Sequence, residues 1–528
     1  MTVLLRRPTD IDVVGWDSWV VIPLATANLD AARRKPGLGL SLETAFDASA
    51  AEWLAIAHEL GQEATAGLAH TPACVSNASD FGQMLAWTRL VAEWAAETPT
   101  TLVVCDDPWL FRHLRQLPGV TAGQAPALWP KALAMAMRGT AARLKAAGRA
   151  IWLSLAMRRH TKAQPSGAAW LLVYAHPRST AEGEDAYFGD CLQRFPGLRR
   201  ALHVDGGQAA AARLLNDNGR TASLHGWGSA WFAFRLLFAR WRPRGKVRSA
   251  SGWLVRRAAA REGATAQPAA ILWQDHCQTR WLTSTRPRLV AWPWENHAWE
   301  RALVRTAHRL GVSTIGYQHS VVGPQMLNYS LGSNPDGPAS IPQRILCSGG
   351  STRAQLAGCG IPVERLDVGG ALRFADVKAV RWDPTAPVFV ALPFDGAVAA
   401  EMVAAAAAVA AGGRRFIVKA HPMLPYHFDP PPGVAITTRA LQQQEAVSAV
   451  LFAATTVGLE AALLNLPVLR FRPADRLSIN IFPSSITAPV TDARHLGQHL
   501  DSVVPIPGIA RDQVFAPVNL ELWSELFA

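Results

Sequence analysis

Short apolar runs alternate with amphipathic or alanine-rich segments along most of this chain. In the second half, runs rich in Val, Ile, Leu and Phe end in small, polar or proline residues. Uninterrupted apolar runs of this length are typical of strands buried on both faces of a parallel sheet. Their alternation with helical segments predicts an α/β fold. The predicted strands include residues 286–291, 314–317, 345–347, 366–368 and 388–392, with helices at 298–310, 351–357, 398–411 and 518–527.

The first half follows a similar pattern with longer helical segments. Residues 19–25 and 101–104 read as strands, and residues 42–60 and 81–96 between them read as helices. An alanine-rich amphipathic helix is predicted at 130–147. Two more apolar runs of strand length follow, at residues 151–156 and 169–175, and the second leads into His176 and a proline.

Two stretches of the second half carry polar residues where a strand ends. Residues 415–422 end on Lys419, His421 and Pro422, and residues 450–471 break at Thr455, Thr456 and Gly458 before a helix at about 457–464. In open α/β sheets, ligands bind outside the carboxyl ends of the strands. A hydroxyl pair that leads into a helix N-terminus favours phosphate, because free N–H groups and the helix dipole attract an anion.

These residues carry a family resemblance. A Lys-x-His-Pro strand end, followed by a Thr-Thr-x-Gly-x-Glu-Ala segment, resembles the donor half of GT-B glycosyltransferases that use CMP-activated sugars, such as bacterial sialyltransferases and capsule Kdo transferases. Residues 294–320 resemble a group of bacterial surface-carbohydrate biosynthesis proteins. Together the two stretches and their flanks cover about a third of the chain. This chain has Thr-Thr where typical relatives have Ser-Ser, and Lys-Ala-His-Pro where some have Lys-Pro-His-Pro.

The resemblance implies a GT-B fold, in which two Rossmann-like domains face a cleft and a C-terminal helix crosses back. The expected domains are residues 1–335 for the acceptor, with an insertion at about 226–262, and residues 343–510 for the donor. Residues 511–528 are the expected crossing helix, and the linker is placed within 324–342.

The overall composition narrows the class of protein. The 528 residues allow two or three domains, and 49% hydrophobic with 17% charged residues indicates a globular chain. A net charge of +12 favours anionic partners, but no zinc-finger spacing or RNA-binding motif points to nucleic acid. Six scattered cysteines without a C-x-x-C pair, and no signal-like or membrane-spanning run, indicate a cytoplasmic protein.

One segment also raises the question of membrane contact. Aromatic residues crowd into 227–241, and nine basic residues against one acidic residue occupy 235–262. Such a sequence suits a helix in the interface of an anionic membrane. An ordinary buried helix followed by a solvated basic loop is the alternative. The expected location is therefore cytoplasmic, with peripheral contact to the inner membrane left open through about 227–261.

Sugar transfer with inversion needs a base for the acceptor hydroxyl and stabilisation of the leaving phosphate. Glu295 follows a strand and is the first choice for the base, although an acid at a helix start is also common. His319 and His421 end strands and are the other catalytic candidates; a hydrogen-bonded core histidine is the alternative for His319. The resemblance assigns the donor to Lys419, His421, Pro422, Thr455, Thr456, Gly458 and Glu460. The acceptor-side candidates are Asp106, Asp107, His176 and Gln318, with helix capping as the alternative for the two aspartates.

No metal or cofactor is expected. Asp10 and Asp12 form the one Asp-x-Asp of the chain and lie far in sequence from the donor stretches. The predicted activity is a metal-independent inverting glycosyltransferase of surface polysaccharide assembly, which uses a CMP-linked acidic sugar and a glycan or lipid-linked acceptor. The alternatives are a CDP-glycerol-type glycerophosphotransferase, a sugar-nucleotide epimerase and a non-catalytic membrane-peripheral scaffold.

Overall fold

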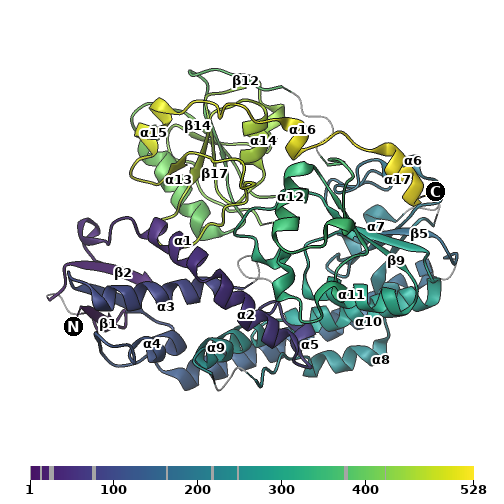
Figure 1. The fold of residues 1–528 in the computed structure, drawn as a ribbon, viewed down its shortest axis with the longest axis horizontal. Coiled ribbons are helices and arrows are strands. Elements are labelled where there is room, and N and C mark those ends of the chain that lie inside the picture. Colours follow the sequence, from purple (N-terminus) through teal and green to yellow (C-terminus); the bar gives the residue numbers. More distant parts are fainter. Residues whose placement is uncertain are drawn as a thin grey trace.

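Three parallel sheets organise the protein in the computed structural model (Figure 1). The structure describes residues 2–11, 15–22, 29–73, 79–161, 164–215, 219–245, 249–373, 379–422 and 424–527. All strand pairs of these sheets are parallel, as the apolar runs predicted. The α/β class and the Rossmann-like character of the sheets are therefore confirmed.

The N-terminal sheet has four strands in the order β2-β3-β1-β4. Its strands are β1 (Val3–Arg6), β2 (Ser18–Ile22), β3 (Thr101–Cys105) and β4 (Val120–Ala122). Its helices are α1 (Leu38–Ala48), α2 (Ala50–Gly61), α3 (Phe81–Ala96), α4 (Pro108–Leu114) and α9 (Gly252–Gly263). These elements share one apolar core that includes Trp53, Trp87 and Trp253. The predicted strand 19–25 is β2, and its residues 23–25 lie outside the described residues.

The central sheet has seven strands in the order β11-β10-β9-β8-β5-β6-β7. Its strands are β5 (Ala169–Val173), β6 (Arg199–Leu202), β7 (Thr221–Ser223), β8 (Leu289–Pro293), β9 (Ser313–Gln318), β10 (Arg344–Cys347) and β11 (Leu366–Val368). The sequence analysis assigned residues 345–347 and 366–368 to the second domain. That assignment is wrong, because β10 hydrogen bonds to β9 and β11 hydrogen bonds to β10. The chain therefore changes sheet only after Val368.

Helices of varied length accompany the central sheet. They are α6 (Cys191–Arg194), α7 (Gln208–Leu214), α8 (Ala230–Ala233), α10 (Gln267–Thr285), α11 (Ala298–Arg309) and α12 (Gly350–Gly358), together with α5 (Leu128–Met157). Helix α5 has 30 residues and continues through residues 151–156. The strand reading of that apolar run is therefore wrong. A short apolar run has no period that separates a strand from a helix, and here it continues an existing helix.

The third sheet has six strands in the order β15-β14-β13-β17-β18-β19. Its strands are β13 (Val388–Ala391), β14 (Phe416–Lys419), β15 (Val434–Ile436), β17 (Val450–Phe452), β18 (Val468–Phe471) and β19 (Val490–Thr491). Helices α13 (Gly396–Ala410), α14 (Val457–Leu463) and α15 (Leu496–Ser502) belong to it, and β12 (Arg381–Trp382) and β16 (Ala446–Val447) form a separate pair. Both predicted donor stretches are thus strand–loop units of one sheet.

The C-terminal segment returns from the third sheet to the central one, as Figure 1 shows. It contains α16 (Arg511–Val514) and α17 (Leu520–Phe527). Trp523 is fully buried against Tyr317 and Phe188, and its indole Nε1 donates to the carbonyl of Gly369. The predicted crossing helix is confirmed, and with it the GT-B arrangement of the central and third sheets.

A buried ion pair joins the N-terminal sheet's α1 to the third sheet. The carboxylate of Glu43 accepts hydrogen bonds from Arg470 at 2.7 and 3.1 Å and from Arg472 at 3.0 Å. Glu43 and Arg470 are both buried.

Among the described helices, none combines the length and the apolar character that a membrane span requires. The five described cysteines are free; Cys74 lies outside the described residues.

Candidate functional site

Three neighbouring strands of the central sheet deliver polar side chains to one edge. In the order β5-β8-β9, these strands lead into His176, Glu295 and His319. Parallel strands end on the same edge, so residues far apart in sequence become neighbours there. On the third sheet, His421 follows β14 and Glu460 lies on α14, directly after β17.

Arg373 connects these two sets of residues. Burial is the largest influence on the pKa of each of these residues, and the positive charge of Arg373 adds a lowering effect on all five: on His176, Glu295 and His319 from the central sheet, and on His421 and Glu460 from the third. Its guanidinium also lies 5.9 Å from the ring centre of Tyr187. The charge of Arg373 therefore acts on residues at the carboxyl edges of both sheets. We call this set of side chains the junction site: His176, Tyr187, Glu295, His319, Arg373, His421 and Glu460.

Arg373 is held by the loop that follows β11. The hydroxyl of Tyr317 donates to the carbonyl of Gly370 at 3.0 Å and accepts from the N–H of Leu372 at 2.9 Å. Gly370 has φ +84°, and a Cβ there would lie 2.3 Å from the carbonyl oxygen of Pro517. The sequence analysis missed Arg373. The glycine pair directly after the predicted strand 366–368 was the available signal, because such pairs mark tight turns at strand ends.

Glu295 is the junction carboxylate with the clearest base-like character. Its side chain is 37% exposed, and burial raises its pKa to about 6 although Arg373 acts in the opposite direction. The ring of His297 lies 3.6 Å from the carboxylate, and burial lowers the pKa of His297 to about 4. A neutral imidazole therefore lies beside a carboxylate that titrates close to neutral pH. Such a pKa suits a general base.

The loop that carries Glu295 is rigidly fixed. Asn296 is buried with φ 59°, and its amide donates to Asn328 at 2.8 Å and to Asn334 at 2.9 Å. The N–H of Glu295 donates to the buried carboxylate of Glu300 at 3.0 Å. Glu300, on the helix that follows, thus holds the main chain of Glu295.

His319 faces Tyr187 in the interior of the junction site. The two rings meet edge to face at 5.0 Å, and His319 is 6% exposed. Burial, and then Arg373, lower the pKa of His319 to about 3, so the imidazole is neutral at physiological pH. Its Nδ1 is buried without a hydrogen-bond partner among the described residues.

Gln318, the neighbour of His319, has a structural role. Its side chain is fully buried, donates to the hydroxyl of Tyr329 at 3.3 Å and accepts from the N–H of Ser320 at 3.3 Å. The predicted acceptor contact of Gln318 is not supported, because both ends of its amide bind the protein itself.

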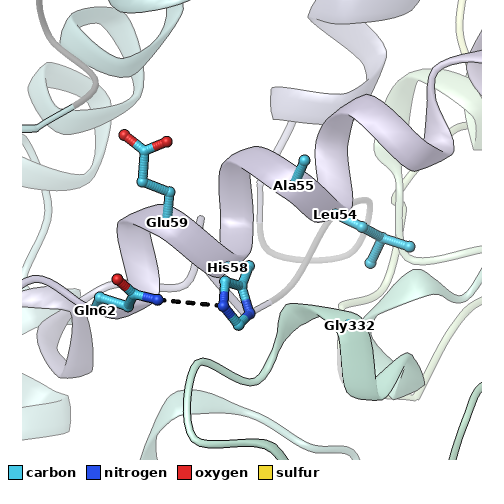
Figure 2. Close-up of a pocket in the computed structure, with 6 residues that line it drawn as sticks. All are labelled: Leu54, Ala55, His58, Glu59, Gln62 and Gly332. Carbon is cyan, nitrogen blue, oxygen red and sulfur yellow. Dashed lines mark hydrogen bonds between the residues drawn. The ribbon is translucent and has the colours of Figure 1, made fainter.

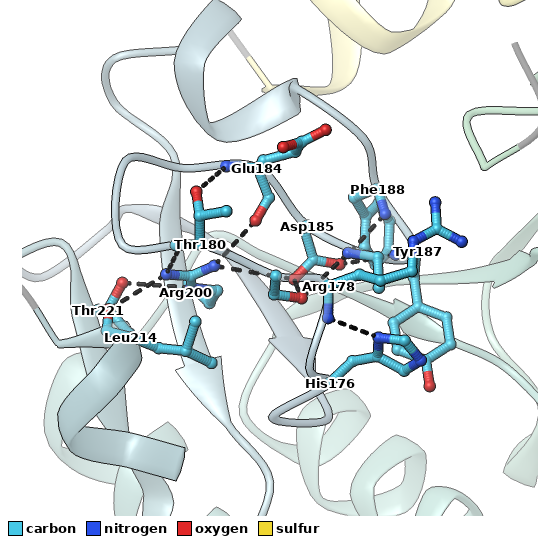
Figure 3. Close-up of polar contacts among 12 residues, drawn as sticks. His176, Arg178, Thr180, Glu184, Asp185, Tyr187, Phe188, Arg200, Leu214 and Thr221 are labelled. Carbon is cyan, nitrogen blue, oxygen red and sulfur yellow. Dashed lines mark hydrogen bonds and ion pairs between the residues drawn. The ribbon is translucent and has the colours of Figure 1, made fainter. Parts of the chain in front are cut away.

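The loop after β5 presents His176 and Tyr187 together (Figure 3). His176 Nδ1 accepts from the N–H of Arg178 at 3.1 Å, and the His176 ring lies 5.8 Å from that of Tyr187. Asp185 accepts from the N–H of Tyr187 at 2.9 Å. Arg200 of β6 lies 3.9 Å from Asp185, and both side chains are fully buried. This buried pair anchors the loop that carries His176 and Tyr187.

On the third sheet, the predicted donor residues divide into two groups. Burial raises the pKa of Glu460 against the opposing charges of Arg373 and Arg178, and burial, then Arg373, lower the pKa of His421. These two belong to the junction site. Lys419 instead donates from Nζ to the carbonyl of Thr438 at 2.9 Å.

The loop between β17 and α14 is tightly packed. A Cβ on Gly458 would lie 2.3 Å from the ring of Phe452, so glycine is needed there for helix α14 to approach β17. Thr455 and Thr456 are half-buried at the start of this helix, and Ala454 before them has φ 44°. Pro422 is exposed just after His421.

The two predicted acceptor aspartates lie elsewhere, on the N-terminal sheet. Asp107 accepts from the N–H groups of Trp109 and Leu110 as the N-cap of α4, and it lies 2.6 Å from the buried guanidinium of Arg257. Asp106 is partly exposed, 3.9 Å from Lys131. The acceptor assignment of Asp107 is wrong, because capping and ion pairing occupy its carboxylate. Asp106 has no recorded contact with the junction site.

A cluster of metal ligands or a separate hollow among the described residues would be an alternative place for chemistry. No group of three or more His, Cys, Asp or Glu residues is arranged to hold a metal there, and Asp12 lies outside the described residues. A hollow of about 490 Å³ lies on α2 (Figure 2), where His58 and Gln62 hydrogen bond at 3.2 Å. None of the predicted site residues lines it.

Comparison with known proteins gives structural similarity alone. No family model matches the chain, and no curated protein matches it. Among solved structures, UDP-GlcNAc 2-epimerase from Methanocaldococcus jannaschii aligns with a TM-score of 0.38 and 11% identity over 68% of this chain and 99% of that one. The glycotransferase of kitacinnamycin aligns with a TM-score of 0.40 and 11% identity over 69% and 100%. UDP-GlcNAc 2-epimerase from Neisseria meningitidis, bound to UDP-GlcNAc, gives 0.37 and 9% over 68% and 99%.

Proposed function

We propose that this chain is a metal-independent, inverting glycosyltransferase of bacterial surface polysaccharide assembly. Its donor would be a CMP-activated acidic sugar and its acceptor a glycan or a lipid-linked glycan. One observation carries the proposal: the positive charge of Arg373 acts on Glu295 and His319 at the carboxyl edge of the central sheet and on His421 at the carboxyl edge of the third sheet. This is the position where open α/β sheets bind their ligands.

The charges of the junction site support an anionic donor. Arg373 acts on residues of both sheets, and the exposed Arg178 acts on Glu460 from the turn after β5. A CMP-linked acidic sugar carries one charge on its phosphodiester and one on its carboxylate. Two arginines that approach from the central-sheet side match these two charges, since guanidinium groups bind both anions well. Thr455, Thr456 and Glu460 are the proposed contacts to the nucleotide.

The proposed reaction is a single displacement. The Glu295 carboxylate takes the proton of an acceptor hydroxyl while that oxygen forms the new bond to the anomeric carbon. The bond between the anomeric carbon and the phosphate oxygen breaks, and its electron pair leaves with CMP. Arg373 and the neutral, hydrogen-donating ring of His421 stabilise the charge that develops on that phosphate. Tyr187 and His319 flank the reacting atoms and orient the acceptor.

Calorimetric titration with CMP, CDP, UMP, UDP and GDP tests the donor site. We expect CMP to bind best of the five nucleotides. His421→Ala or Arg373→Ala should raise the Kd for CMP by about 10- to 100-fold, because each removes one charge-assisted contact. The matched controls are His58→Ala in the hollow of Figure 2 and Arg494→Ala on the exposed surface, and both should bind CMP as the wild type does.

The other outcomes separate the competing functions. A preference for UDP would discard the acidic-sugar donor and keep the junction site. Interconversion of a free UDP-sugar without any acceptor would identify an epimerase, and CDP-glycerol turnover would identify a glycerophosphotransferase. If none of the nucleotides binds, the catalytic proposal fails and the non-catalytic scaffold becomes the favoured function.

A further inference from the structure

Helix α5 exposes an apolar stripe along much of its length. Six large apolar side chains recur at spacings of three, four, seven and eight residues, which places them on one face of a helix. Each is more than half exposed. At 1.5 Å per residue the stripe extends over about 40 Å. Its members are Trp129, Leu133, Met137, Leu144, Trp152 and Leu155.

A second group of exposed aromatic side chains lies beside this stripe. Trp231 of α8 is 84% exposed, and Phe234 and Phe238 follow it in the next turns with more than half of their surface exposed. These turns pack against α5, where the buried Arg143 donates to the carbonyl of Leu237 at 3.1 Å. Figure 1 shows α5 and α8 together at the lower edge of the molecule. We call the two groups together the apolar face.

Basic side chains border the apolar face. Lys131, Arg138 and Lys145 are exposed at intervals of seven residues on α5, and Arg149 follows one turn later. This row lies along one flank of the stripe, because a seven-residue step returns to almost the same side of a helix. Helix α5 contains no Asp or Glu. Of the four, Lys131 has a carboxylate nearby, that of Asp106 at 3.9 Å.

A basic hollow of about 680 Å³ adjoins the aromatic group. Phe238 forms part of its lining. Four arginines and one glutamate also line it, which leaves a net charge of +3. The glutamate, Glu63, accepts hydrogen bonds from the N–H groups of Arg244 and Gly245 at 2.9 and 2.8 Å. The arginines are Arg235, Arg240, Arg242 and Arg244.

We propose that the apolar face docks on the surface of an anionic phospholipid bilayer, with the basic hollow receiving a lipid phosphate. Exposed Trp, Phe and Leu side chains would enter the boundary between headgroups and acyl chains, where aromatic rings are favoured. The basic row would then lie at the level of the negative headgroups. A second copy of the chain fits the face poorly, because pairing would bring rows of like charge together.

This face differs from the segment that the sequence suggested. Trp227 and Trp241 of that segment are buried, and Arg257 is buried between Asp80 and Asp107. Lys246 and Arg248 lie outside the described residues. The lipid-facing part is therefore the exposed aromatic turn together with α5, not the whole of residues 227–261.

Vesicle flotation of the full chain tests the proposal. The probes are vesicles of phosphatidylcholine alone and vesicles with an equal amount of phosphatidylglycerol. We expect binding to the anionic vesicles at low salt that is about tenfold stronger or more than to neutral ones, and that falls at high salt. The apolar variant combines Trp129→Ser, Trp231→Ser and Phe238→Ser, and it should lose binding at least about tenfold.

Two further variants make the result specific to this face. The basic variant Arg235→Gln, Arg240→Gln and Arg242→Gln should lose the preference for anionic vesicles while keeping the same circular dichroism spectrum. The control Trp382→Ser, Leu424→Ser and Val504→Ser removes similarly exposed apolar side chains from the third-sheet region, and it should bind as the wild type does. Failure of the wild type to float at low salt overturns the proposal. Unchanged flotation of both face variants also overturns it. A third contrary result would be a wild-type protein that does not bind vesicles but forms a dimer in sedimentation, with the apolar variant abolishing that dimer.

Discussion

The Tyr317 hydroxyl is the contact whose removal best tests how Arg373 is positioned. Tyr317 is fully buried, and its hydroxyl bridges the carbonyl of Gly370 and the N–H of Leu372. Tyr317→Phe keeps the ring and removes both hydrogen bonds. Each buried polar group left without a partner costs about 1–3 kcal/mol. Two such groups are left, so we expect the loop at 369–373 to lose about 2–6 kcal/mol of local stability.

Hydrogen exchange measured by mass spectrometry on peptides that cover residues 366–373 is the matching assay. A loss of 2 kcal/mol should raise exchange in this loop by about 30-fold, since each 1.4 kcal/mol is a factor of ten. Peptides of the third sheet should exchange as in the wild type. Under the proposed function, CMP binding should weaken by about tenfold, because Arg373 becomes less well placed.

Tyr426→Phe is the matched control for this prediction. Tyr426 stacks on Phe428 at 5.9 Å, and no hydrogen bond of its hydroxyl is recorded among the described residues. It should leave exchange at 366–373 unchanged. If Tyr317→Phe also leaves that exchange within about twofold of the wild type, the hydroxyl does not hold the loop and the argument fails.

Three further changes probe the remaining steps of the reasoning. Transferase activity should rise with pH through about 6 as the Glu295 carboxyl ionises, and Glu295→Gln should abolish the activity over the whole range. Gly458→Ala should lower thermal stability by about 1–3 kcal/mol, because its Cβ would meet the Phe452 ring. Arg257→Met should cost about 3–5 kcal/mol in a urea titration, since it leaves the buried carboxylate of Asp107 without its cation. Burial raises the pKa of Asp80, but hydrogen bonding to Arg257 outweighs this and lowers it, so the ion pair's contribution is lost as pH falls below about 4.

Each of these results has an outcome that would contradict it. A pH profile without a rise near 6 would remove Glu295 as the base, and retained activity in Glu295→Gln would do the same. A Gly458→Ala protein as stable as the wild type would mean that α14 can shift from β17. An Arg257→Met protein whose urea midpoint is unchanged at neutral pH would show that water already compensates the Asp107 carboxylate.

The local sequence pattern determined the strands and helices, and it determined which polar residues follow the carboxyl ends of the strands. The apolar runs that became β13 and β17 are buried on both faces, and β14 alternates buried and half-buried residues. The ends of β14 and β17 lead into His421, Thr455 and Glu460 because turns or helices follow directly. Such signals come from neighbours in sequence, so the sequence alone reveals them. The same reasoning placed Glu295 and His319 at strand ends of the central sheet.

Tertiary contacts decided which of those residues share a site. Arg373 reaches the junction site because β11 lies at the edge of the central sheet and Tyr317, more than fifty residues earlier, fixes its loop. Asp107 is withdrawn from chemistry by Arg257, which is 150 positions away. Sheet membership, ion pairing and exposure depend on partners distant in the chain, and no local period encodes them. For that reason the polar residues at the strand ends could be predicted from the sequence, whereas the action of Arg373 on residues of both sheets became visible only in the tertiary structure.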